Sequence, residues 1–329
     1  MSPGSPTPGA AMAVGMVALA LKHPGMKPQN PKSNSAAVRT GWVFGTLGML
    51  GFSLTLPMTR MAVQELPPVF VGLGRALIAG FLGAVLLWRR RSPLPRKHHI
   101  PGLLLVAAGA IVGFPLLSSL ALRHAPASHG AIVVGLLPLA TALFGAWFAR
   151  ERPTARFWFA ALAGSATVVL FALSESGWTL RPADGLFAVA AILCGMSYAE
   201  GGRLSRELGG LPTISWALIL VSPITATAVI WSMQGASLHA SGWAWGAFAY
   251  TGTVSMFLAF WSWYHGLAAG GIARIGQVQL LQVFVTLFWA HLLLDEVVTF
   301  RALFAAAAVV LSVAVSRRAA IRTDGAVSR

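Results

Sequence analysis

A few polar and ionisable side chains interrupt long apolar stretches of this sequence, and their types could do chemistry. Arg75 lies eight residues into an apolar run that begins at residue 67. A charge at the centre of a membrane-spanning helix costs ~2.5–3.5 kcal/mol on insertion scales, so such a residue needs a partner or a function. Arg75 is therefore either a fixed cation that attracts a substrate carboxylate or an arginine bonded to carbonyls of neighbouring helices.

Glu200 lies near the end of another apolar run and also allows two interpretations. A carboxylate removed from water favours its protonated form, which would suit proton coupling. Alternatively, Glu200 pairs with Arg203, three residues later on the same helix face. The short spacing favours the pair, and proton coupling by Glu200 is kept as the second hypothesis.

Gln279 and Gln282 are three residues apart and share one helix face, with Gln277 off that face. Their amides predict either a wet cavity that binds a polar substrate or hydrogen bonds that join helices. Trp263 is expected in the aromatic belt at the membrane surface, because it lies near the expected end of its helix. The remaining cavity candidates are Ser53, Pro138, Tyr198, Trp261 and Tyr264.

The sequence carries no recognisable catalytic or cofactor-binding arrangement. It has no Walker phosphate-binding motif, no zinc-protease His-Glu-x-x-His and no hydrolase Gly-x-Ser-x-Gly. Its single cysteine, Cys194, excludes an intramolecular disulfide and a Cys-based zinc site. We therefore expect no enzyme activity, no metal and no cofactor.

Composition places the chain in a lipid bilayer. Hydrophobic residues make up 56% of it and charged residues 10%, with a mean hydropathy of +0.72. Soluble domains carry roughly 25% charged residues, so this chain cannot cover a water-facing surface. The net charge of +15 arises from basic residues in short gaps between apolar runs, which indicates membrane topology and not binding of nucleic acid.

The apolar runs predict an all-α integral membrane protein with ten spanning helices, each near the ~20 residues that a span requires. Residues 1–38 and 319–329 are expected to be tails, the first of them disordered. The expected spans are 41–58, 67–88, 100–122, 127–149, 155–174, 183–203, 212–233, 241–263, 272–294 and 299–316.

The distribution of basic residues predicts the orientation. If the N-terminus lies inside, 19 of the 24 Lys and Arg residues fall in inner segments and four in outer loops. Positively charged loops stay in the cytoplasm. We therefore expect a protein of the inner (plasma) membrane with both termini cytoplasmic.

Two blocks of the sequence resemble each other. Both begin with a loop of small residues, continue through an apolar helix and end on an acid, so that Glu151 corresponds to Glu296, 145 residues later. The duplication predicts two five-helix repeats, 39–176 and 177–318. Because five is odd, the second repeat is inverted in the membrane, which places a binding site between the halves.

The sequence resembles the EamA-like transporters of the drug/metabolite transporter superfamily over about residues 40–318. The most specific matches are Ala121–Ser128 (ALRHAPAS), Leu136-Leu137-Pro138 and Glu151-Arg152-Pro153; the family also commonly carries an arginine in a run like that around Arg75. In the second repeat Gln282-Val283 replaces the acid or Gln followed by Pro that is frequent there. The resemblance implies ten helices in two repeats and export of metabolites or drugs, often amino acids, without ATP.

We therefore expect a secondary transporter that moves small metabolites by alternating access, with a small-molecule substrate and the bilayer as its partners. A drug efflux or uptake carrier is the alternative in the same class. An integral membrane enzyme or a lipid-handling protein is the alternative in another. The sequence does not specify the oligomeric state.

Overall fold

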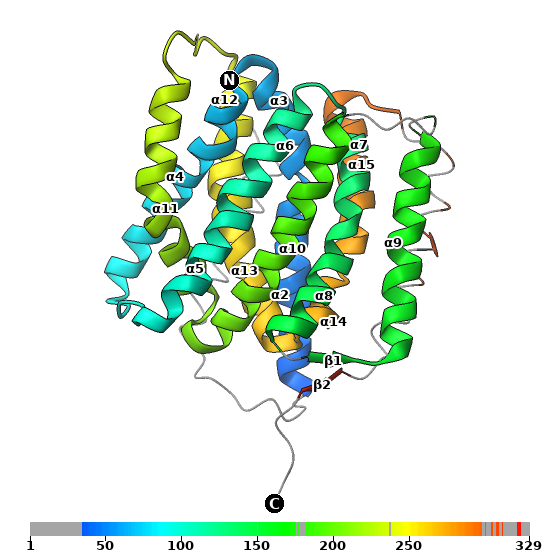
Figure 1. Cartoon of the computed structure of the whole chain (residues 1–329). Helices are drawn as coiled ribbons and strands as arrows, with labels where there is room; N and C mark the ends of the chain where they lie inside the picture. Colours follow the sequence, from blue (N-terminus) through cyan, green and yellow to red (C-terminus); the bar gives the residue numbers. More distant parts are fainter. Residues whose placement is uncertain are drawn as a thin grey trace, which may run out of the picture.

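The protein is a bundle of long helices (Figure 1). The computed structural model describes residues 35–149, 151–175, 177, 182–236 and 238–297, single positions beyond residue 297, and residues 321–323. Most of the expected tails at 1–38 and 319–329 and most of the tenth expected span, 299–316, therefore lie outside the described residues. The first helix begins at Ser35, inside the expected tail.

The elements follow the expected apolar runs. The first half contains α2 (Ser35–Ser53), α3 (Thr55–Glu65), α4 (Pro68–Arg89), η1 (Lys97–His99), α5 (Ile100–Val106), η2 (Ala107–Gly113), α6 (Phe114–Leu122), α7 (Ala127–Val133), η3 (Val134–Leu136), α8 (Leu137–Phe148), β1 (Glu151–Pro153) and α9 (Ala155–Glu175). The second contains α10 (Pro182–Leu208), α11 (Gly210–Ser232), α12 (Gly242–Tyr250), η4 (Thr251–Ala259), α13 (Phe260–Gly270), α14 (Ile272–Gly276), α15 (Gln279–Leu294) and β2 (Ile321–Thr323), which pairs antiparallel with β1.

Seven helices among the described residues are long and apolar enough to cross a membrane. They are Ala37–Glu65, Pro68–Arg89, Lys97–Leu122, Ala127–Phe148, Pro182–Leu208, Gly210–Met233 and Ile272–Leu294. Two further expected spans are helical, as α9 and as α12 through α13, but do not belong to these seven. The multi-pass helical class is confirmed, and ten spans remain a prediction.

Several helices are longer than expected. The first runs to Glu65 and not to residue 58, because Pro57 is only the third residue of α3. The N–H that it lacks would bond Ser53 of α2, so no bond between two residues of α3 is lost. The sixth helix ends at Leu208 and the eighth continues to Gly270, past the expected ends at 203 and 263. Helix ends near polar residues are poorly marked in the sequence when the helix extends beyond the bilayer.

Prolines inside the helices free backbone carbonyls, and hydroxyl groups bond two of them. Pro57 has no N–H for the carbonyl of Ser53, which instead accepts from Thr286 Oγ1 at 2.8 Å. Pro223 similarly frees the carbonyl of Ile219, which accepts from Ser222 Oγ at 2.8 Å. The first of these bonds joins α2 to α15, so a local interruption becomes a contact between the two halves.

The fourth helix is interrupted near its middle, and the ninth near its start. Before Pro138, the fourth narrows to the 3-10 segment η3, and the Leu137 N–H bonds the Val134 carbonyl that Pro138 would otherwise leave free. The ninth breaks at Gln277–Val278, between α14 and α15, although Val283 stands where a proline is frequent. An interruption therefore forms in the second repeat without a proline.

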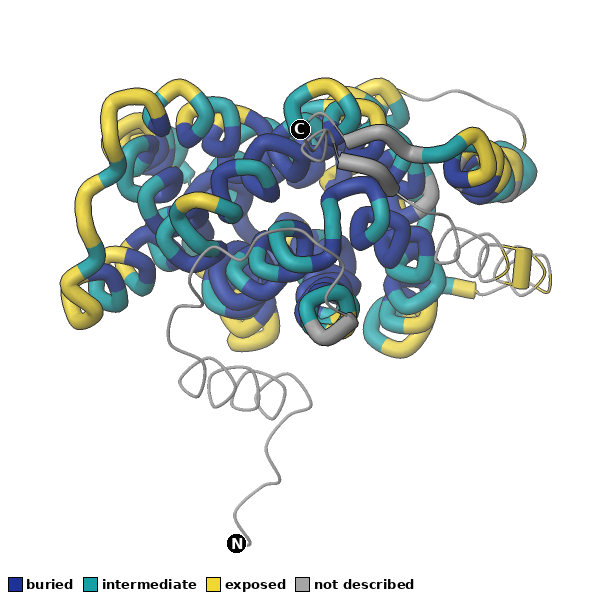
Figure 2. Tube along the Cα trace, turned by 90° about the horizontal axis from the view of Figure 1, so that it is seen from below, coloured by how far each residue is buried: buried dark blue, intermediate teal, exposed yellow. Residues whose placement is uncertain are grey.

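The core lies along the middle of the bundle, and large apolar side chains face outward. Figure 2, a view along the bundle, shows buried residues in the centre and exposed ones around the rim. The outward-facing residues include Phe81, Trp88, Ile224 and Trp231. Such an exposed apolar surface is what a bilayer requires. Trp263, expected at the membrane surface, is instead fully buried, because α13 continues seven residues past it to Gly270.

The fourth and ninth helices run in opposite directions. In Figure 1, α7 lies at the upper end and α8 at the lower, whereas α14 lies at the lower end and α15 at the upper. Contacts agree with this view, because α14 packs against α8 and α15 against α7.

Candidate functional site

A small cavity lies in the middle of the bundle, between the first, fourth and ninth helices. Its volume is about 10 Å³, roughly what a single water molecule occupies. The lining residues are Leu56, Ala131, Val134, Leu137, Gln279, Gln282, Val283 and Thr286. The cavity is therefore closed in this conformation and includes residues from both halves of the chain.

Glutamine side chains supply the polar surface of this cavity. The Oε1 atoms of Gln279 and Gln282 are buried and have no hydrogen-bond partner in the described part of the chain, and neither polar atom of the nearby Gln277 has one. Buried carbonyl oxygens without donors cost free energy. Gln279 and Gln282 thus present two acceptors that a ligand's N–H groups could satisfy.

Arg75 lies in α4 with only 2% of its surface exposed. Its Nε and Nη1 atoms have no acceptor among the described residues. Tyr198 lies next to it and also within interaction distance of Gln279. A buried guanidinium with open donors, linked through Tyr198 to an amide with an open acceptor, can bind a ligand that carries both an anion and a donor.

An aromatic cluster borders this group. Tyr198 packs against Phe260 and Trp263 with ring centroids 5.7 and 5.5 Å apart, and Tyr264 lies 5.5 Å from Phe260. Tyr264 and Trp263 are fully buried, whereas Trp261 is only partly buried and packs against the core. The rings of Phe260, Trp263 and Tyr264 pack around Tyr198, and neither Trp261 nor Tyr264 lines the cavity.

Glu200 forms an ion pair with Arg203. Arg203 donates from Nε to Oε2 at 2.8 Å and from Nη2 to Oε1 at 2.6 Å. The carboxylate also lies against Gly102 on the third helix, where a Cβ atom would collide with it. Arg203 is thus the partner that the sequence favours for Glu200, and proton coupling remains a prediction.

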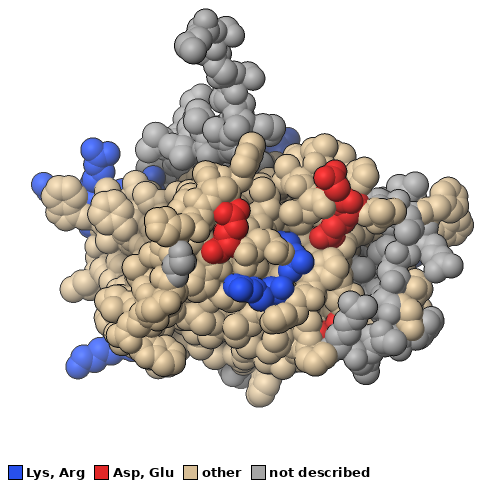
Figure 3. Space-filling view, turned by 90° about the horizontal axis from the view of Figure 1, so that it is seen from above, with Lys and Arg blue, Asp and Glu red and all other residues tan. Residues whose placement is uncertain are grey.

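Glu296 connects the ends of the two interrupted helices. Its carboxylate accepts from the backbone N–H groups of Ala127 at 3.0 Å and Ser128 at 2.9 Å, the first residues of α7. The free N–H groups and dipole at a helix N-terminus favour a carboxylate. We call these two bonds the upper clasp. Figure 3, the upper face of the molecule, shows acidic and basic groups close together on a largely uncharged surface.

Two further bonds connect the halves at this upper end. Glu65, at the end of α3, accepts from Ser241 Oγ at 2.7 Å, and Ser241 begins α12. His129 of α7 pairs with Asp184 of α10. Deeper in the bundle, Thr55 Oγ1 and Ser255 Oγ lie 2.7 Å apart. The upper side of the cavity is closed by contacts between the halves.

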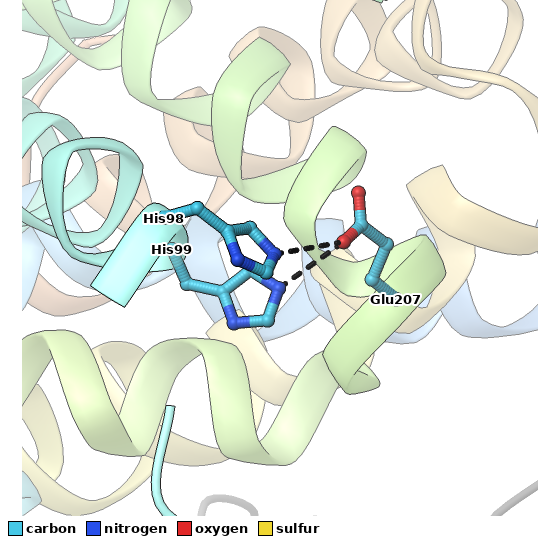
Figure 4. A group of neighbouring side chains, drawn as sticks. All are labelled: His98, His99 and Glu207. Carbon is cyan, nitrogen blue, oxygen red and sulfur yellow. Dashed lines mark hydrogen bonds and ion pairs between the residues drawn. The ribbon is translucent and has the colours of Figure 1, made fainter. Parts of the chain in front are cut away.

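At the lower end, His98 and His99 meet Glu207 of α10 (Figure 4). His99 Nδ1 accepts from the Arg96 N–H at 3.2 Å, which assigns the ring proton to Nε2, 3.1 Å from Glu207 Oε2. A metal ion would need the Nε2 lone pair that this proton occupies. The geometry therefore favours a hydrogen-bonded link between η1 and α10.

The structure brings together some of the candidate residues and separates others. Gln279 and Gln282 line the cavity, Pro138 follows its lining residue Leu137, and Ser53 reaches Thr286 through its carbonyl. Arg75 and Tyr198 form the adjacent polar group. Glu200, Trp261 and Tyr264 do not line the cavity.

Sequence reasoning did not single out Thr286, or any role for Glu296 beyond marking the duplication. The freed carbonyl before Pro57 signals a missing donor, but only the fold identifies Thr286 as that donor.

Comparisons with known proteins agree with this architecture. The model of the EamA-like transporter family matches residues 39–173 and again residues 181–318. A Bacillus subtilis (strain 168) protein named uncharacterized transporter YdeK is 42% identical over 284 residues, covering 84% of this chain and 97% of that protein. A solved crystal structure superposes with a TM-score of 0.69 at 20% identity, over 84% of this chain and 98% of the other, which supports the fold alone.

Proposed function

The chain belongs to the EamA-like transporter family, and we propose that it is a secondary carrier that exports small zwitterionic metabolites, such as amino acids, by alternating access. The observation that carries this proposal is the closed cavity between the halves, connected through Tyr198 to a buried arginine whose donors have no partner among the described residues. Its coarser basis, a multi-pass membrane transporter, follows from the family and the relative.

Two inverted five-helix halves would supply the alternating access. The two family-model matches and the opposite directions of the fourth and ninth helices support this arrangement. So do Ser53 and Ser197, which lie in a second match of the duplication, Gly51-Phe52-Ser53 with Gly195-Met196-Ser197 at an offset of 144 residues, and both donate to the carbonyl three residues earlier, at 2.6 and 2.8 Å. We further propose ten spans and an inner-membrane location with both termini in the cytoplasm, from the distribution of basic residues.

The open hydrogen-bonding atoms suggest the class of substrate. The guanidinium of Arg75 lacks a carboxylate partner among the described residues, and Gln279 and Gln282 lack donors. An α-amino acid carries both missing groups, a carboxylate for the arginine and an ammonium for the amide oxygens. Opening of the closed cavity to one face at a time would then admit and release it.

Counterflow of radiolabelled amino acids in proteoliposomes tests this proposal. We expect exchange of at least one radiolabelled amino acid. The unlabelled amino acid should compete with this exchange, whereas the corresponding amine, which lacks the carboxylate, and the corresponding carboxylic acid, which lacks the ammonium group, should not. Arg75→Gln should weaken apparent binding ~10–100-fold, since hydrogen bonds to charged groups contribute ~1.5–3 kcal/mol. Arg39→Gln, which removes an exposed arginine, is the control. Absence of exchange across a broad panel of metabolites would refute the carrier; exchange of drugs alone would favour the efflux alternative.

A further inference from the structure

A second, larger hollow lies away from the central cavity, where the end of α4 packs against α11. It is an open groove with a volume of about 790 Å³, within the size range of small-molecule sites. Trp88, Trp216 and Ile219 form its apolar walls, and Arg89, Arg91 and Ser92 lie at one side of it. Because α4 is a spanning helix that ends at Arg89, the hollow lies where the membrane meets water.

The walls of the hollow continue into a surface that faces lipid. Phe81, Ala84 and Trp88 are exposed at helical spacing along one face of α4. An apolar groove that ends at arginines and tryptophans has the polarity of a phospholipid, with acyl chains on one side and a phosphate on the other. The two arginines favour an anionic lipid over a neutral one.

The backbone at Arg91 forms the turn that ends α4 beside the hollow. The Ser92 N–H bonds the Leu87 carbonyl at 3.0 Å and the Arg91 N–H bonds the Trp88 carbonyl at 3.1 Å, a Schellman motif. Its turn residue, Arg91, has φ 49°, a left-handed conformation in which glycine is usual and other residues are strained. Glycine would adopt this conformation without strain, so replacing Arg91 by glycine removes the charge without harming the turn.

We propose that this hollow binds an anionic phospholipid of the surrounding membrane, with its phosphate on Arg89, Arg91 and Ser92 and an acyl chain along Trp88, Trp216 and Ile219. The site is separate from the central cavity and does not depend on the transported substrate. Bound lipid would hold the ends of α4 and α11 together and stabilise the folded protein in proportion to its occupancy.

Titration of phosphatidylglycerol into the full-length protein in detergent, followed by thermal unfolding, tests the proposal. We expect saturable stabilisation by phosphatidylglycerol and none by phosphatidylcholine. Arg89→Gln with Arg91→Gln should raise the apparent Kd ~25-fold, about fivefold for each arginine near an anionic headgroup. Arg96→Gln with Lys97→Gln removes the same charge from the same connection outside the hollow and should change it less than threefold.

Two further variants separate binding from folding. Arg91→Gly should weaken the binding of phosphatidylglycerol about fivefold. The unfolding temperature in phosphatidylcholine should stay equal or rise, because glycine relieves the strain of the left-handed turn. Ala84→Trp should fill the groove and remove the stabilisation with every arginine in place. Equal losses in the two double variants would show surface electrostatics only and overturn the site. So would equal stabilisation by glycerol phosphate, or unchanged lipid response in Ala84→Trp.

Discussion

The upper clasp makes a quantitative prediction about how the cavity opens. Glu296 accepts two backbone N–H bonds, at 3.0 and 2.9 Å, from the start of α7. Its own backbone is fixed by His291 Nδ1, 2.7 Å from the Glu296 carbonyl oxygen. If the carrier opens upward, these bonds break, and both N–H groups and the carboxylate return to water. Glu296→Gln should therefore favour the open state.

The size of the effect follows from the bonds that change. A bond to a charged acceptor contributes ~1.5–3 kcal/mol and a neutral one ~0.5–1.5 kcal/mol. The side chain of glutamine has one neutral acceptor oxygen, which can bond only one of the two N–H groups. The second N–H group lies at the partly exposed helix end and bonds water instead. The closed state then loses ~2 kcal/mol relative to the open state. That loss raises the population of a minor open state ~30-fold, at a factor of ten for each 1.4 kcal/mol.

A cysteine in the cavity can report this opening. Val134 lines the cavity and is buried, and the single native cysteine, Cys194, is also buried and can be replaced by alanine. A membrane-impermeant maleimide applied from the upper side should label Val134→Cys ~10–30-fold faster when Glu296→Gln is present. Asp295→Asn is the control, because Asp295 makes no bond to α7 among the described residues and asparagine tolerates its left-handed φ of 54°. Equal labelling rates with and without Glu296→Gln would refute the clasp as a gate.

Two other predictions concern single side chains. Thr286→Val leaves the buried Ser53 carbonyl without its donor and should lower the free energy of unfolding by ~1–3 kcal/mol. Thr253→Val is the control, because it removes an exposed hydroxyl that bonds within its own helix and should not lower the free energy of unfolding. Equal unfolding temperatures in the two variants would contradict this account. If Glu200 carries the coupling proton, Glu200→Gln should abolish transport driven by a pH gradient and spare counterflow. Unchanged gradient-driven transport would limit Glu200 to its ion pair with Arg203.

The sequence predicts the helices because each apolar run must be long enough to span the bilayer, and that requirement is local. It misplaces Trp263 because belt residues are inferred from distance to a helix end, and the eighth helix continues to Gly270. It does not predict the break at Gln277, because Gly276 alone precedes that residue, no proline stands there, and tertiary packing decides the conformation.

The site could be predicted only in part, for a related reason. Gln279 and Gln282 stand out as amides in an apolar run, and three-residue spacing puts them on one face. The partners of Ser53 and Ala127 are more than 150 residues away in sequence, at Thr286 and Glu296. No spacing rule within one helix reaches that far, so the contacts that close the cavity are visible only in the fold.

Alternating access is the central claim, and labelling from both sides of the membrane tests it most directly. Val134→Cys in the Cys194→Ala background would be exposed to an impermeant maleimide in right-side-out and in inside-out vesicles. We predict labelling from either side, with Glu296→Gln speeding reaction from the upper side and slowing it from the lower, since one cavity opens to one face at a time. Labelling from one side only, or equal acceleration from both sides, would contradict a carrier that opens in alternation.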